Sequence, residues 1–233
     1  MSGHGLREGK PAGSVHLVGH VMIDNLLHQL ENMKTVGAGT TKVEIATAPE
    51  RRFAMTEDGL TKGEYAFMTL HRPSNVDDSD TFMGIAEALN EIAEKMPILF
   101  PVHPRTKKMM EQFQIKFSEN IMMMPPLGFK ESLFLWKDAK VVLTDSGGLQ
   151  EETTALGIPC VTIQENTERP ITVEMGTNVL AGTTKEGILK AYAEALKKAK
   201  QATVPPLWDG KAAARIWEVL KNVKRVPGAT RLG

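Results

Sequence analysis

The stretch VVLTDSGGLQEETTALGIPCVTI (Val141–Ile163) decides the expected fold of this 233-residue chain. An apolar run is followed by two glycines, a segment with helical composition, a Gly-Ile-Pro break and a second apolar run. Short apolar runs on either side of one helical segment predict two parallel strands joined by a crossover helix. The glycines lie between the first strand and the helix, where bare backbone lets a ligand approach the first amide groups of the helix.

The same alternation extends to both sides of this stretch. Apolar segments predict strands at 64–70, 97–102, 120–124, 141–144, 159–163 and 178–182. Helical patterns fill the gaps, at 77–96, 105–117, 130–139, 148–157, 169–176 and 185–200. Strands that are apolar throughout, rather than alternating, indicate a sheet covered on both faces. We therefore predict an α/β fold, a doubly wound parallel sheet in a single Rossmann-like domain.

Residues outside that alternation set the expected domain limits. Residues 1–14 are rich in glycine and polar residues and predict a flexible tail, and 224–233 predict a C-terminal tail. A short strand and an amphipathic helix are expected within 15–33, and a last amphipathic helix is expected at 211–223. Residues 15–223 as a whole are predicted to form one ligand-binding domain.

Composition excludes several classes of function. Lys plus Arg equals Asp plus Glu at 28 each, so the net charge is zero and no overall field would recruit nucleic acid or an anionic membrane. The single cysteine, Cys160, rules out an internal disulfide and fits a reducing compartment. We find no signal peptide, no apolar stretch of about 18 residues and no His, Cys or Asp cluster with metal-ligand spacing. We expect a cytoplasmic protein with no metal, no cofactor, and no nucleic-acid or membrane partner.

Polar residues or glycines follow nearly every predicted strand. Ligands of such sheets bind outside the carboxyl ends of the strands, so these residues are the candidates for a site. They are His71 and Arg72, His103, Leu127, the run Ser146, Gly147 and Gly148, and Arg169.

The glycine loop itself has two readings. The first amides of a helix carry partial positive charge and have no internal partner, so Ser146 and the two glycines after it could hold a phosphate. Glu152, farther along the helix, could accept hydrogen bonds from a ribose diol, whereas Glu151 is expected on a solvated face. Phosphate plus ribose describes a nucleotide, and a tight turn without a ligand is the equally open alternative. The DSGG of chymotrypsin-like proteases is excluded because it belongs to a β-barrel fold.

In this order, the motifs resemble those of the C-terminal domain of the non-hydrolysing UDP-N-acetylglucosamine 2-epimerases, a family with a two-domain glycosyltransferase-B-type fold. The resemblance covers residues 15–223, and the run from Thr144 to Pro170 is its most specific part. The matching motifs are GHVMIDNL, TLHRPSN, FPVHPR, PPLGF, LTDSGGLQEE, GIPCVTI and TERPITVEMGTNVLAG.

The resemblance implies a role for each candidate residue. His71 matches a catalytic histidine of the family. The UDP site would consist of the Leu127 backbone at uracil, Ser146, Gly147 and Gly148 at the diphosphate, Glu152 at the ribose, and Arg169 at the phosphates or sugar. Arg72 and His103 match positions that help to hold a second, regulatory UDP-N-acetylglucosamine in bacterial members. Three positions depart from the family pattern: His20 stands for a usual Asn, and Pro73 and Ser74 stand for Arg and Glu.

The family reaction inverts C2 of the sugar and yields UDP-N-acetylmannosamine, through elimination of UDP and its re-addition to the opposite face. The resemblance places an N-terminal domain of more than about 100 residues ahead of VHLVGH, and that domain brings acidic catalytic groups. We therefore expect a UDP-binding domain of an epimerase that is inactive alone. The alternatives are a stand-alone UDP-sugar-binding module or a regulatory subunit. Expected partners are UDP or a UDP-N-acetylhexosamine, and either a second copy or a separately encoded N-terminal domain.

Overall fold

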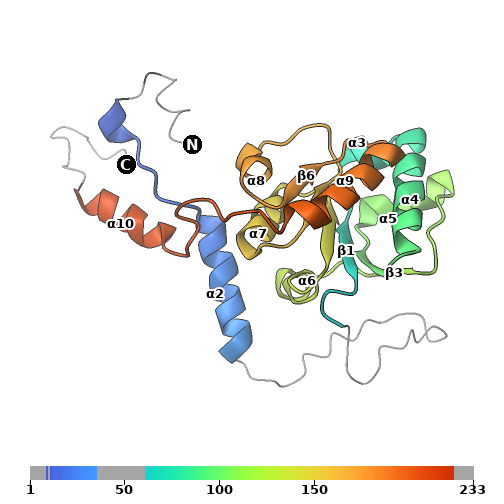
Figure 1. The fold of residues 1–233 in the computed structure, drawn as a ribbon, viewed down its shortest axis with the longest axis horizontal. Coiled ribbons are helices and arrows are strands. Elements are labelled where there is room, and N and C mark those ends of the chain that lie inside the picture. Colours follow the sequence, from blue (N-terminus) through green and yellow to red (C-terminus); the bar gives the residue numbers. More distant parts are fainter. Residues whose placement is uncertain (1–8, 10, 36–60, 223–233) are drawn as a thin grey trace, which may run out of the picture. The chain divides into compact units, whose positions relative to one another are not determined.

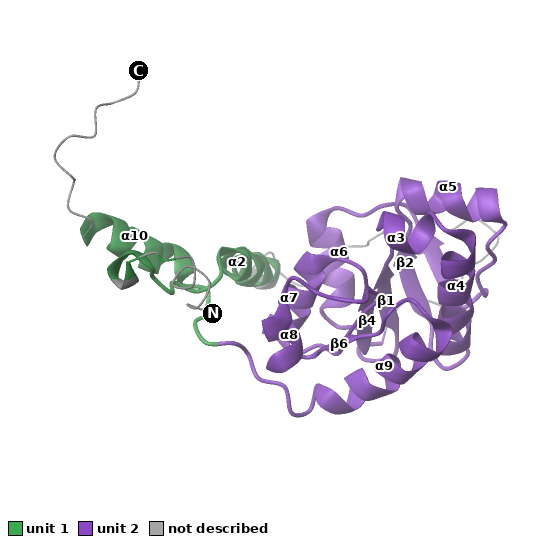
Figure 2. Cartoon of the chain, turned by 90° about the horizontal axis from the view of Figure 1, so that it is seen from above, with its two compact units in different colours: residues 1–37, 206–233 green, residues 38–205 purple. Residues whose placement is uncertain are grey.

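The computed structural model of the chain describes residues 9, 11–35 and 61–222. These residues belong to two compact units, one formed by 1–37 with 206–233 and one by 38–205 (Figure 2). The domain predicted at 15–223 therefore includes parts of both units. The predicted tail 224–233 lies outside the described residues. Of the predicted tail 1–14, only residues 9 and 11–14 are described, and Ala12–Ser14 form the short 3-10 helix η1.

The larger unit is built on a parallel sheet of six strands, in the order β3-β2-β1-β4-β5-β6 (Figure 1). The strands are β1 (Ala66–Thr69), β2 (Ile98–Pro101), β3 (Ile121–Met124), β4 (Val141–Thr144), β5 (Cys160–Thr162) and β6 (Asn178–Leu180). This order confirms the predicted doubly wound fold. The chain leaves β1 toward one edge and returns to β4 beside it, so the topological switch point lies between these two strands.

Helices cover both faces of the sheet. α4 and α9 pack together over one face, and α6 and α7 lie over the other (Figure 2). The helices are α3 (Pro73–Val76), α4 (Ser79–Ala93), α5 (Pro104–Phe113), α6 (Phe129–Trp136), α7 (Gly147–Leu156), α8 (Pro170–Glu174) and α9 (Lys185–Lys198). Side chains cap three of them: Asp78 accepts from the amide of Thr81 (2.9 Å), His103 from that of Arg105 (3.1 Å) and Thr184 from that of Gly187 (3.2 Å). α3 was not predicted, because four residues carry no helical periodicity.

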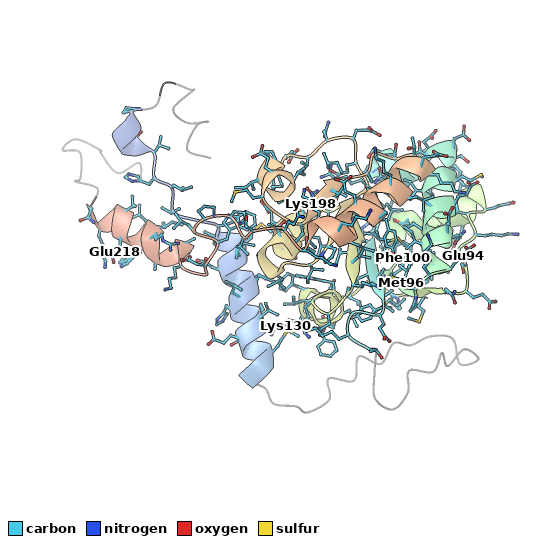
Figure 3. All side chains as sticks on the ribbon, viewed as in Figure 1. Glu94, Met96, Phe100, Lys130, Lys198 and Glu218 are labelled. Atoms are coloured by element: carbon cyan, nitrogen blue, oxygen red, sulfur yellow. The ribbon has the colours of Figure 1, made fainter. Side chains whose placement is uncertain are left out.

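The core explains the apolar strands. Successive residues of β1, from Ala66 to Met68, are fully buried although they point to opposite faces of the sheet. A lysine side chain connects three elements of the unit. Lys198 in α9, labelled in Figure 3, donates hydrogen bonds to the carbonyl oxygens of Val173 (2.5 Å) and Asn178 (2.7 Å). Burial lowers the pKa of this lysine. The three-way contact holds α8, β6 and the end of α9 together.

The smaller unit pairs two helices from opposite ends of the chain, α2 (Val21–Thr35) and α10 (Ala212–Asn222). The Asp24 carboxylate accepts hydrogen bonds from the amides of Ala212 (3.1 Å) and Ala213 (2.7 Å), so a side chain of α2 caps α10. None of the described helices, in either unit, has the length and apolar character needed to cross a membrane.

The strand predicted ahead of α2 is absent from the described residues: 15–20 form an irregular segment. Gly19 has a φ of +103°, and a Cβ there would lie 2.4 Å from the carbonyl oxygen of Leu207. Its position therefore requires glycine for a close approach between two backbone segments. Among the described residues of this unit there is no strand to pair with 15–20, and apolar composition alone does not make one.

Candidate functional site

A cleft of about 190 Å³ opens at the carboxyl ends of the strands, at the switch point between β1 and β4. It brings together four predicted site residues from four different loops: His71, His103, Leu127 and Ser146. The other residues that line it are Thr69, Leu70, Pro101, Pro126, Ser132 and Leu149. The remaining predicted residues, which are Arg72, Gly147, Gly148, Glu152 and Arg169, do not line the cleft.

The N-terminus of α7 is open toward a ligand. Ser146 is the N-cap residue, with extended backbone, but its side chain makes no capping hydrogen bond. Its amide instead donates to Oγ1 of Thr144 (2.9 Å), and that hydroxyl is paired with the hydroxyl of Thr69 (2.6 Å). A Cβ on Gly147 would meet no atom within 4 Å. A hydroxyl that does not cap the helix and an unobstructed glycine thus stand at this helix terminus, whose first amides have no partner within the helix, and such a terminus can hold an anion.

His71 is held by a residue to which the sequence had assigned no role. Asp145, the first residue after β4, is fully buried, and its Oδ1 lies 2.9 Å from Nδ1 of His71. Its Oδ2 accepts from the backbone amides of His71 (2.8 Å) and Arg72 (2.7 Å) and from Nδ2 of Asn75 (3.3 Å). The hydrogen bond to Asp145 raises the pKa of His71, and burial of the imidazole opposes that effect.

His103 caps a helix and also lines the cleft. Its Nδ1 accepts from the amide of Arg105 (3.1 Å), so it caps α5. Its ring also lines the cleft, and the ring centroid lies 5.7 Å from that of His71. Two imidazoles therefore stand side by side at the ends of β1 and β2, where either can meet an anionic or hydroxylic ligand.

Both glutamates of α7 are buried, which corrects the expectation that Glu151 lies on a solvated face. The side chain of Glu151 is 6% exposed, and its Oε1 lies 2.8 Å from Nε of Arg169. Burial, with the charge of Glu151, raises the pKa of Glu152 to about 7. The cause is the packing of α7, which contacts β4, β5, β6 and α8 and leaves few of its side chains exposed.

Gln150, which was also missed, ties α7 to the loop that carries Arg169. Its Oε1 accepts from Oγ1 of Thr167 (2.5 Å) and from Nδ2 of Asn178 (3.3 Å). The same threonine hydroxyl accepts from the amide of Arg169 (2.9 Å). Arg169 is thus fixed at its backbone through Thr167 and at its guanidinium through Glu151. Adjacent polar residues in one helix gave no sign that they would bind this loop.

Fold and site together define a Rossmann-like α/β protein whose anion-ready helix terminus lies at the switch point. The chain belongs to the UDP-N-acetylglucosamine 2-epimerase family, whose family model matches residues 4–221. This confirms the family predicted from the motifs.

Curated relatives agree with this membership. The chain is 37% identical over 221 residues to the UDP-N-acetylglucosamine 2-epimerase of Methanocaldococcus jannaschii, a match that covers 92% of this chain and 57% of the relative. It is 35% identical over 208 residues to the UDP-2,3-diacetamido-2,3-dideoxy-D-glucuronate 2-epimerase of Pseudomonas aeruginosa, covering 87% of this chain and 58% of the relative.

Solved structures agree as well. The crystal structure of the Methanocaldococcus jannaschii enzyme in complex with UDP-GlcNAc and UDP matches with a TM-score of 0.75 and 36% identity. The match covers 93% of this chain and 57% of that one. The chain therefore spans a little over half the length of the proteins that it resembles.

Proposed function

We propose that the larger unit binds the UDP part of a UDP-N-acetylhexosamine at the carboxyl ends of its strands, and that the chain is the UDP-binding domain of a 2-epimerase. The observation that carries this proposal is the N-terminus of α7. It presents an uncommitted Ser146 hydroxyl and an open Gly147 at the switch point, beside His71. In support, a relative with 36% identity was crystallised with UDP-GlcNAc and UDP.

The proposed roles follow from position. Ser146, Gly147 and Gly148 hold the diphosphate on the first amides of α7, where the helix dipole favours negative charge. Leu127 lines the cleft and offers its backbone to uracil. His71 is the proposed catalytic residue, because its imidazole lines the same cleft as Ser146, the N-cap residue of α7.

Glu152 and Arg169 are proposed to contact the ribose and the phosphates, although neither lines the cleft. The side chain of Arg169 is 37% exposed; its Nε is paired with Glu151 and its Nη1 lies 3.5 Å from the exposed Glu168 carboxylate, and we propose that an anion replaces Glu168 there. Arg72 and His103 are proposed for a second nucleotide-sugar position, supported by the place of His103 on the cleft wall. A cytoplasmic location is part of the same proposal. Its support is the single cysteine, Cys160, which is free and buried and fits a reducing compartment.

The sugar is the least constrained part of the ligand. Two relatives with similar identities, 37% and 35%, are named for different UDP-linked 2-acetamido sugars. The cleft of about 190 Å³ is also smaller than the roughly 300–1,000 Å³ of sites that enclose a ligand. The proposed ligand class is therefore defined by UDP, and the sugar extends beyond the cleft.

We propose that this chain turns over only with a complementary polypeptide. Inversion at C2 needs a group that removes a proton on one face and a group that delivers one on the other. Within the described residues, His71 and His103 are the only titratable side chains that line the cleft, and no carboxylate does. A further domain, or a second copy, would supply the opposing wall. The competing function is a UDP-sugar-binding module or regulatory partner, favoured by the same lack of carboxylates.

The test has two parts. Titration calorimetry should show that UDP binds more tightly than uridine, because only UDP reaches the helix terminus. Proton NMR of UDP-N-acetylglucosamine in deuterated water should show no exchange at C2 with the purified chain. Exchange should begin when an N-terminal domain of a relative is added, and stay absent with His71→Ala. Equal affinities for UDP and uridine would refute the binding site, and exchange by the chain alone would refute the need for a partner.

A further inference from the structure

The buried carboxylate of Asp145 is surrounded by donors from the neighbouring strand end. Its Oδ1 lies 2.9 Å from Nδ1 of His71, and its Oδ2 accepts from the backbone N–H groups of His71 and Arg72 and from the amide group of Asn75. An ionised carboxylate can only accept hydrogen bonds, and every one of these four contacts offers a donor when the His71 proton is on Nδ1. The donor set therefore matches the acceptor oxygens of this carboxylate.

The fold brings these two side chains together without a ligand. β1 and β4 are neighbours, and Thr69 pairs in register with Thr144. His71 lies two residues beyond the first strand and Asp145 one residue beyond the second, so both stand at the same edge of the sheet. The carbonyl oxygen of Asp145 also accepts from Nε2 of Gln164 (2.5 Å), which fixes its backbone from the β5 side.

We propose that Asp145 is a positioning residue for His71: its buried carboxylate keeps the proton of the neutral imidazole on Nδ1 and leaves Nε2 to face the cleft. The imidazole side chain is 41% exposed and lines the cleft while Nδ1 is engaged, so Nε2 is the nitrogen that a ligand can reach. When the imidazole is neutral, Nε2 can accept a proton from the ligand. Protonated, it donates to an anionic oxygen of the ligand.

Two charged groups, Asp145 and Arg72, act on the charge of this imidazole, and a second imidazole faces it. The hydrogen bond to Asp145 raises the pKa of His71, and Arg72 on the same loop lowers it. His103, on the β2 side, places a second imidazole 5.7 Å away between ring centroids. Because the contact with Asp145 is the largest of these effects, removing its charge should make His71 lose its proton at lower pH.

A merely structural role for Asp145 makes a different prediction. Through Oδ2 alone, Asp145 links the backbone amides of His71 and Arg72 to the side chain of Asn75 in α3. That structural role requires no effect on the tautomer or the pKa of the imidazole. The change Asp145→Asn separates the two roles. One oxygen remains for the backbone amides, whereas the new NH₂ group can donate to Nδ1 but cannot accept from it. The ring must then carry its proton on Nε2.

The experiment is long-range proton–nitrogen NMR of the imidazoles in the full chain, with the His71 signals assigned through His71→Gln. We expect the Nδ1–H tautomer in the unmodified chain, and the Nε2–H tautomer with a lower titration midpoint in Asp145→Asn. Asn75→Ala is the matched control, since it removes another donor from the same carboxylate and should change neither. An Nε2–H tautomer in the unmodified chain would overturn the proposal, even if the Asp145 variant failed to fold.

A second readout rests on the proposed function, since it uses UDP. The affinity for UDP should fall as pH rises through the His71 midpoint. In Asp145→Asn that fall should occur at lower pH, with binding about tenfold weaker near neutral pH from loss of a charged donor. An unchanged pH profile and an unchanged tautomer in the variant would refute the positioning role. If UDP fails to bind the unmodified chain at any pH, the proposed function is wrong, and the NMR tautomer still decides the role of Asp145.

Discussion

Replacing Gly147 by valine tests the anion site at the start of α7 with little risk to the fold. No atom lies within 4 Å of the point where its Cβ would stand, so the larger side chain projects into open space. The helix propensities of glycine and valine differ by only about 0.4 kcal/mol. We expect the free energy of unfolding to change by less than about 0.5 kcal/mol.

The effect on ligand binding should be much larger. The two methyl groups of valine would stand in front of the first amides of α7, where the proposed diphosphate lies. A hydrogen bond to a charged group contributes roughly 1.5–3 kcal/mol. Losing one such bond should weaken UDP binding about 10- to 150-fold, since each 1.4 kcal/mol is about a factor of ten. Uridine carries no phosphate, so its affinity should be nearly unchanged.

Calorimetric titrations of UDP and uridine measure both numbers on the same sample. Gly84→Val is the matched control, because Gly84 lies in α4 and its Cβ would also meet nothing within 4 Å. It should leave both affinities intact. If Gly147→Val binds UDP as well as the control does, the phosphate does not sit on this helix terminus and the reasoning fails.

Three further predictions address the buried acid, the arginine and the last helix. The pKa of Glu152, raised to about 7 by burial, lies above its unfolded value of 4.5. Its contribution to stability is therefore complete below about pH 4.5 and lost as pH rises through about 7. Glu152→Gln should remove this decline of about 3 kcal/mol in urea unfolding between about pH 5 and 8, and an unchanged slope would contradict it. Arg169→Ala should weaken UDP at least tenfold and uridine little, and calorimetry showing equal losses would exclude a phosphate contact. Trp217 and Leu220 on α10 are 60% and 58% exposed, so sedimentation should show self-association that Trp217→Lys reduces, and a strictly monomeric chain would speak against that surface.

Much of the larger unit could be predicted because its strands are buried on both faces. Such strands appear as continuous apolar runs with glycine or proline at their ends, and β4 begins and ends where the sequence predicted it, at 141 and 144. The segment 15–20 has similar apolar character, but the described part of its unit holds no neighbouring strand, and the segment forms none. Whether a segment forms a strand depends on hydrogen bonds to another strand that is distant in sequence, and a local sequence pattern does not predict those bonds.

The site shows the same division between local and tertiary information. The meeting of His71 with Ser146 followed from topology alone, because parallel strands end at one edge of the sheet. The role of Asp145 depends on hydrogen bonds to residues more than 70 positions earlier, which spacing does not reveal. Glu151 was misplaced because two adjacent acids suggest a solvated face, whereas the packing around α7 buries them both.

The cap that Asp24 gives to α10 has a consequence for the order of assembly during synthesis. The carboxylate and the amides that it binds are 188 and 189 positions apart, so the amides leave the ribosome long after the carboxylate. The larger unit is continuous in sequence and can form as soon as residue 205 has emerged, because domains fold as units during synthesis. α2 is made first, yet must wait for the last helix before its partner exists. A ribosome stalled after residue 205 would therefore carry a folded sheet and an unpaired first helix.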